Sequence, residues 1–153
     1  MANFVYNIAK GRVGEYFNRV KSNDPSTSAI ILIPLSASGT EAEGQDYDTV
    51  AQVLAGTADE RTTGSWVRKT LTDSDLSAWA PDDTNNRGPA TIPEVSLGSP
   101  AAGNDTTGLL VCYDPVTGSG DDTQIVPLVH LDMVVEADGN EVIIDSGDVF
   151  RAT

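Results

Sequence analysis

The chain has 153 residues, of which 39% are hydrophobic and 21% are charged, a composition typical of a globular domain and unlike that of a disordered or collagen-like chain. Nine Lys and Arg residues against 23 Asp and Glu residues give a net charge of −14, which makes non-specific attraction to nucleic acid or to an anionic membrane unfavourable. We therefore expect one domain, residues 1–153, with neither nucleic acid nor a membrane as its partner.

The first predicted element is an amphipathic helix over about residues 8–21. Apolar residues recur there at helical spacing, with charged residues between them. The apolar set is Ala9, Val13, Tyr16, Phe17 and Val20. Asn7 is the expected N-cap. Gly11 and Gly14 each cost a helix about 1 kcal/mol relative to Ala, so this helix should depend on docking against a larger surface.

A strand and a second helix are expected next. Residues Ala29–Leu35 form a short β-branched run bounded by turn residues, which is typical of a strand buried on both faces. Pro34 favours an edge position or a bulge near the end of this strand. The second helix is expected at about 47–55, with Asp46 as its cap and Gly56 just past its end.

After Gly56 the apolar runs are strand-like and are separated by turn residues. The expected strands are Ser65–Leu71, Ala90–Leu97, Gly108–Tyr113, Ile125–Val135 and Glu141–Ile144. Asp138-Gly139 is expected to close a tight hairpin between the last two. The sequence thus predicts an α+β, mainly β fold: an antiparallel β-sandwich or partial barrel with one or two short N-terminal helices and a β-rich body at about 57–153.

Few residues in the chain could carry catalysis. His130 and Cys112 are the single histidine and cysteine, and both lie in apolar strands. We interpret His130 as a hydrogen-bonded strand residue and Cys112 as a small core residue, since its acidic surroundings would not lower the pKa of the thiol. A Cys–His pair stays as the alternative. Phosphate-loop, dinucleotide and zinc motifs are absent from the sequence, so we expect no enzyme and no cofactor.

Acidic residues are clustered in several predicted loops, at 73–75, 82–83, 121–122 and 136–141. Such loops can supply oxygen ligands to calcium, but none has the full alternating ligand pattern of a helix-loop-helix calcium site. We therefore interpret them as turn residues and solubilising charges, and we expect no metal site.

Arg87 lies in one of these acidic loops and is the only Lys or Arg between Lys69 and Arg151. Three interpretations are open. Arg87 could tie the loop together, pair across a subunit boundary, or form an exposed salt bridge worth under about 1 kcal/mol.

Charge is divided unevenly along the chain. Residues 1–21 carry four basic residues against Glu15, a net charge of +3, whereas residues 89–153 carry 11 acidic residues against Arg151, a net charge of −10. The lone cysteine cannot form an internal disulfide and no secretory signal is visible, which favours assembly in a reducing cytoplasm.

Four segments carry a resemblance to a known class of proteins. They are residues 2–11 (ANFVYNIAKG), 82–87 (DDTNNR), 110–114 (LVCYD) and 127–132 (PLVHLD). In this order they resemble small virion structural proteins of tailed bacteriophages, many of which begin with a similar stretch. The resemblance implies a non-enzymatic building block of the particle. Within that class we expect a capsid decoration, or cement, protein that binds the major capsid protein on the outer surface of the shell.

The resemblance also implies a homo-oligomer, with a trimer expected because decoration proteins commonly occupy three-fold positions. The basic residues Lys10, Arg12, Arg19, Lys21 and Arg87 are our candidates for capsid or subunit contacts. The alternative for the first helix is that it only covers one end of the protein's own sheet. Two other functions stay open: a connector or tail component of the same particle, and a calcium-dependent carbohydrate-binding β-sandwich.

Overall fold

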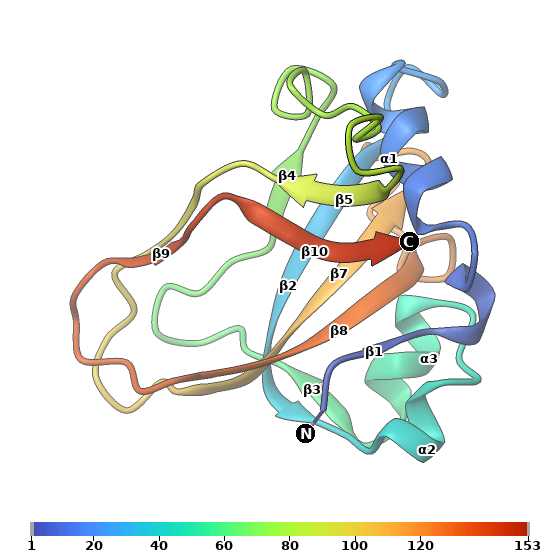
Figure 1. Cartoon of the computed structure of the whole chain (residues 1–153). Coiled ribbons are helices and arrows are strands. Elements are labelled where there is room, and N and C mark those ends of the chain that lie inside the picture. The colour runs from blue at the N-terminus through green and yellow to red at the C-terminus, as the bar shows by residue number, and fades with distance from the viewer. Residues whose placement is uncertain (1, 153) are drawn as a thin grey trace.

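A computed structural model describes residues 2–152 (Figure 1). Its first half contains β1 (Phe4–Val5), the 3-10 helix η1 (Asn7–Ala9), α1 (Val13–Lys21), β2 (Ala29–Ser38), α2 (Glu41–Gly44), α3 (Val50–Ala55), β3 (Ala58–Glu60) and β4 (Lys69–Leu71). Its second half contains β5 (Gly88–Ile92), β6 (Val95–Gly98), β7 (Thr106–Asp114), β8 (Val126–Val135), β9 (Val142–Ile144) and β10 (Gly147–Ala152).

A six-stranded sheet with the order β1-β8-β7-β2-β3, in which β4 also pairs with β2, forms the centre of the described structure. Its pairs are all antiparallel. Two further antiparallel pairs, β5–β10 and β6–β9, form separate ribbons, and β5–β10 crosses the front of the sheet in Figure 1. The α+β, mainly β class predicted from the sequence is therefore confirmed.

Strand β2 shows why the sheet is buried on both faces. Ile30 and Leu32 enter a core that also contains α1 and residues of β5 and β6. Ile31 and Ile33 enter a second core with residues of α3. Because side chains alternate along a strand, its continuous apolar run supplies both cores. The expectation of a strand buried on both faces is confirmed.

Pro34 does not mark an edge strand, because β2 pairs with β7 on one side and with β3 and β4 on the other. It lies between the two shorter partners, where its carbonyl accepts a hydrogen bond from the Arg61 N–H at 2.9 Å. The register of β2 against β3 shifts between Leu35 and Ala37, so the expected bulge near the end of the strand is confirmed.

The predicted helix at 8–21 is wrong in its first turn. Residues 7–9 form η1, and α1 begins only at Val13. Gly11 adopts a φ of +76°, which lies outside the right-handed helical region and interrupts the helix. Asn7 is therefore not its N-cap; that position is held by Arg12, without a side-chain cap.

The second helix is shorter than predicted and has a different cap. α3 starts at Val50 with a capping box, in which the Thr49 hydroxyl accepts from the Gln52 N–H and the Gln52 side chain accepts from the Thr49 N–H. Asp46 instead accepts a hydrogen bond from the Asn7 side chain at 2.5 Å. Gly56 closes α3 as expected, and the short α2 was not predicted.

Most of the predicted strands are present, with changed bounds. Strand β4 covers only the last three residues of the run predicted from Ser65, and the run at 90–97 is divided at Pro93 into β5 and β6, since proline cannot donate to a strand ladder. β10 was not predicted.

The hairpin expected at Asp138-Gly139 is wrong, because β9 pairs with β6 while β8 pairs with β7 and β1. The Gly139 N–H donates instead to the Pro100 carbonyl at 3.0 Å. This bond fixes the turn against the segment after β6, so β9 does not return along β8.

Candidate functional site

The outward face of α1 carries exposed positive charge. The inner face is fully buried through Val13, Phe17 and Val20, so the helix does cover its own sheet. On the outer face, Arg12 and Arg19 lie 3.4 Å and 3.2 Å from Glu15 and are about half exposed. Their hydrogen bonds and charge lower the pKa of Glu15.

Three of the five predicted contact residues lie together at this end of the molecule. Lys10 is exposed just before α1, and no ion pair of Lys10 is found within residues 2–152. Arg12 and Arg19 share Glu15, and Lys10, two residues before Arg12, lines a hollow with Glu41; these three basic and two acidic residues together carry a net charge of +1. We call these three basic residues, Lys10, Arg12 and Arg19, the basic end.

Lys21 and Arg87 have contacts inside the chain. The Lys21 ammonium donates to the Trp79 carbonyl and lies 5.7 Å from the centroid of the Trp79 ring. Arg87 binds Asp82 at 2.8 Å, and their backbones form a small antiparallel bridge. Arg87 therefore ties its own loop together, as the first of its three interpretations expects.

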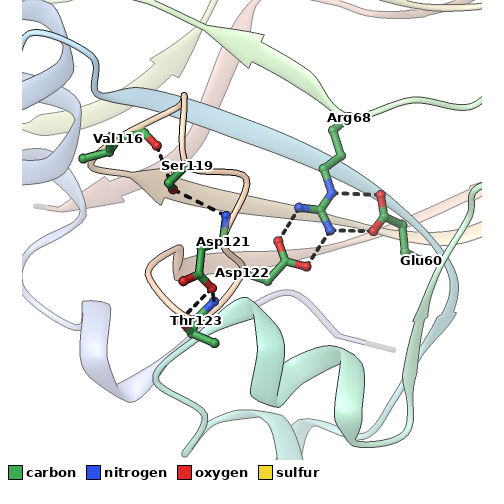
Figure 2. A network of polar contacts seen from close by, with 7 residues as sticks. All are labelled: Glu60, Arg68, Val116, Ser119, Asp121, Asp122 and Thr123. Carbon is green, nitrogen blue, oxygen red and sulfur yellow. Dashed lines mark hydrogen bonds and ion pairs between the residues drawn. The ribbon is translucent and has the colours of Figure 1, made fainter.

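A polar cluster that the sequence did not predict lies at the other face of the sheet (Figure 2). Arg68 donates to both carboxylate oxygens of Glu60, at 2.9 and 2.6 Å, and to both of Asp122, at 2.5 and 2.9 Å. These hydrogen bonds raise the pKa of the guanidinium. We call these contacts of Arg68 with Glu60 and Asp122 the Arg68 clamp. It joins the loop before β8 to β3.

The same loop is also held at the start of α3 and by its own turns. The N–H groups of Val50 and Ala51 donate to the carbonyls of Ile125 and Asp122 at 2.9 and 3.0 Å. In Figure 2, Asp121 accepts from the Thr123 N–H and hydroxyl, which lowers the pKa of its carboxyl. The 121–122 acidic pair therefore stabilises a loop.

Other acidic clusters have similar local partners. Asp75 accepts from Thr72, Asp82 from Asn85, and Asp138 from Asn140. Within residues 2–152, no group of three or more His, Cys, Asp or Glu side chains is arranged to hold a metal ion. These contacts support the interpretation as turn residues.

Cys112 and His130 are both completely buried. Burial raises the pKa of the Cys112 thiol, which disfavours the nucleophilic thiolate, and its interpretation as a core residue is confirmed. His130 is cross-strand partner to Leu110, whereas Cys112 is opposite Pro127, so the register does not pair them. His130 is a strand residue, as expected, and is paired with Phe4 and Leu110. Neither ring nitrogen makes a hydrogen bond of full geometry within the described residues, and the Ala2 backbone is the polar group that acts on the ring.

The opposite end of the molecule is acidic. We define the arm as residues 93–105 and 132–146, which include the ribbon β6–β9 and the end of β8. It extends from the body on the side away from α1 in Figure 1. The arm contains no Lys or Arg and seven carboxylates: Glu94, Asp105, Asp132, Glu136, Asp138, Glu141 and Asp145. The excess of acidic residues in the C-terminal part of the chain can be counted in the sequence. Their location on the side of the molecule away from α1 is known only from the fold.

Comparisons of the chain with protein-family models, curated proteins and solved structures find no match. Among the helices of residues 2–152, none has the length and apolar character needed to cross a bilayer.

Proposed function

We propose that the chain is a non-enzymatic structural protein of a tailed-bacteriophage particle, and that it decorates the outer surface of the capsid shell by binding the major capsid protein. The observation that carries this proposal is the basic end: charged groups are exposed on α1 and just before it, and the opposite face of this helix is packed into the core. An attachment surface needs this combination of accessible charge and fixed position.

The rest of the molecule supports the same role. Both faces of the central sheet are packed against core residues, and the Arg68 clamp holds the loop before β8 beside the sheet. A protein that binds a shell through shape and charge requires such a stiff body, because flexible surfaces lose conformational entropy when they bind. The resemblance of four segments to small virion proteins is the reason for proposing a phage particle as the structure to which the chain belongs.

Purified phage particles provide the test. We expect the chain to be present in many copies, and particles assembled without it to release DNA at a lower temperature. A Lys10→Gln/Arg12→Gln variant should bind such particles less tightly than a Lys69→Gln/Arg151→Gln variant, which loses the same charge elsewhere. The proposal is overturned if the chain is free in the lysate and absent from particles, or if both variants bind as the wild type does.

A further inference from the structure

The arm has an uncovered strand edge and exposed aliphatic side chains. β1 pairs with β8 only at Val129 and His130. The Asp132 N–H donates to the Asn3 side chain at 2.7 Å, and beyond it no strand of residues 2–152 pairs with this edge of β8. Val134 is 71% exposed and Ile143 on β9 is 48% exposed. An open edge with exposed apolar residues is a surface that favours a partner.

Charge identifies which partner fits. The two segments of the arm contain seven carboxylates and no Lys or Arg, and Arg61, which donates to the Asp105 carbonyl at 2.9 Å, contacts the arm from outside them. The excess of carboxylates gives the arm a negative potential. The complementary surface on this chain is the basic end, and Figure 1 places α1 and the arm on opposite sides of the body. The long stems of Lys10 and Arg12 can also cover aliphatic side chains while their charged groups meet carboxylates.

We propose that the arm of one copy binds the basic end of a second copy, head to tail. Like ends of two copies repel each other, whereas unlike ends attract. A contact between two different surfaces leaves one arm and one basic end free in each pair, so further copies add until the rotation closes a ring. The inference rests on the proposed decoration role and deepens it: the basic end would hold each copy on the shell through its neighbouring copy, which adds to the affinity of the assembly for the shell.

This contact can be tested with the purified chain by reversing charges on the basic end in one variant and on the arm in another. The first variant, Lys10→Glu/Arg12→Glu, makes the basic end acidic. The second, Glu136→Lys/Asp145→Lys, makes the arm basic at two exposed residues. A matched control, Asp48→Lys/Asp83→Lys, changes the net charge as much as the second variant but lies outside both surfaces. Molar mass is measured by light scattering and sedimentation over a range of protein and salt concentrations.

We expect the wild type and the control to associate, more weakly as salt rises from about 50 mM to about 0.5 M because salt screens the contact. Each surface variant alone should associate about tenfold more weakly or worse, and an equal mixture of the two should recover association. A monomeric wild type, or surface variants that associate as the control does, overturns the proposal. Failure here with normal occupancy on particles would leave the decoration role intact and assign the arm to a different partner.

Discussion

The ring of Phe4 stacks on the imidazole of His130, with ring centroids 5.2 Å apart and planes inclined by 11°. The two residues are also direct cross-strand partners between β1 and β8. Because the His130 side chain is completely buried and its nitrogens make no hydrogen bond of full geometry within residues 2–152, a proton on the ring would be poorly solvated. The N-terminal strand therefore packs on an imidazole whose burial favours the neutral form.

Stability should consequently fall in weak acid. Burial lowers the pKa of His130, and this effect outweighs the opposing effects of the Asp132 charge and of the Ala2 backbone. An unfolded histidine has a pKa of about 6.5, so the unfolded chain binds more protons below that pH than the folded chain does. The free energy of unfolding should be undiminished above about pH 6.5 and fall below it, by at most about 1.4 kcal/mol per pH unit from this residue.

Urea unfolding between about pH 7.5 and about pH 5.5 measures this dependence, in a range where carboxylates contribute little. His130→Phe keeps an aromatic ring beside Phe4 and removes the titrating group. The variant should lack the loss of stability that the wild type shows as the pH falls. Equal slopes in the two proteins would contradict a buried neutral imidazole.

A second prediction concerns Gly108, which lies between Ser38 and His130. A Cβ at this position would be 2.5 Å from Ser38 Oγ and 2.6 Å from His130 Nε2, closer than non-bonded atoms approach each other. Gly108→Ala should therefore destabilise the protein by about 1 to 3 kcal/mol through overpacking. Thermal or urea unfolding measures the change.

Gly88 in β5 is the matched control, because a Cβ there would meet no atom within 4 Å. Gly88→Ala should be neutral or slightly stabilising, since alanine restricts the unfolded chain. Adding Ser38→Ala to Gly108→Ala should recover part of the loss. Similar stabilities for Gly108→Ala and Gly88→Ala would show that the space above Gly108 is not tightly packed.

The Arg68 clamp gives a third prediction. Arg68→Met keeps most of the side-chain packing but leaves the carboxylates of Glu60 and Asp122, whose side chains are 16% and 29% exposed, without their shared partner. We expect a loss of about 2 to 3 kcal/mol in the free energy of unfolding, because two partly buried charges become unpaired.

Two comparisons separate the clamp from ordinary surface pairs. Arg12→Met breaks an exposed pair and should cost less than about 1 kcal/mol. Combining Arg68→Met with Glu60→Gln and Asp122→Asn should restore part of the stability, because the unpaired charges are removed. If Arg68→Met costs no more than Arg12→Met, the clamp does not stabilise the loop.

The sequence predicted those elements that local pattern determines. The runs that became β2, β7 and β8 are long and apolar, with several β-branched residues each, so their local composition favours strands. Strand partners depend instead on distant segments. The Asp138-Gly139 turn looked like a hairpin, yet its hydrogen bond to Pro100 and the pairing of β9 with β6 arise from contacts that no local window contains.

Some residues of the candidate site could likewise be predicted from the local sequence, and others could not. Exposed basic residues around α1 were visible as a local excess of charge. Arg68 was not singled out, because its partners lie 8 and 54 residues away along the chain and only the fold brings them together. Gly11 likewise delays the start of the predicted helix to Val13 by adopting a positive φ, which apolar periodicity does not reveal.

The N-terminus of α3 provides a fourth prediction, since it distinguishes the cap that forms from the cap that was expected. Thr49→Ala removes the hydroxyl that accepts from the Gln52 N–H and should lower the free energy of unfolding by about 1 kcal/mol. Asp46→Ala removes only an exposed contact with Asn7 and should cost less than about 0.5 kcal/mol. Urea unfolding of both variants ranks the two positions, and a larger loss for Asp46→Ala would contradict the capping box.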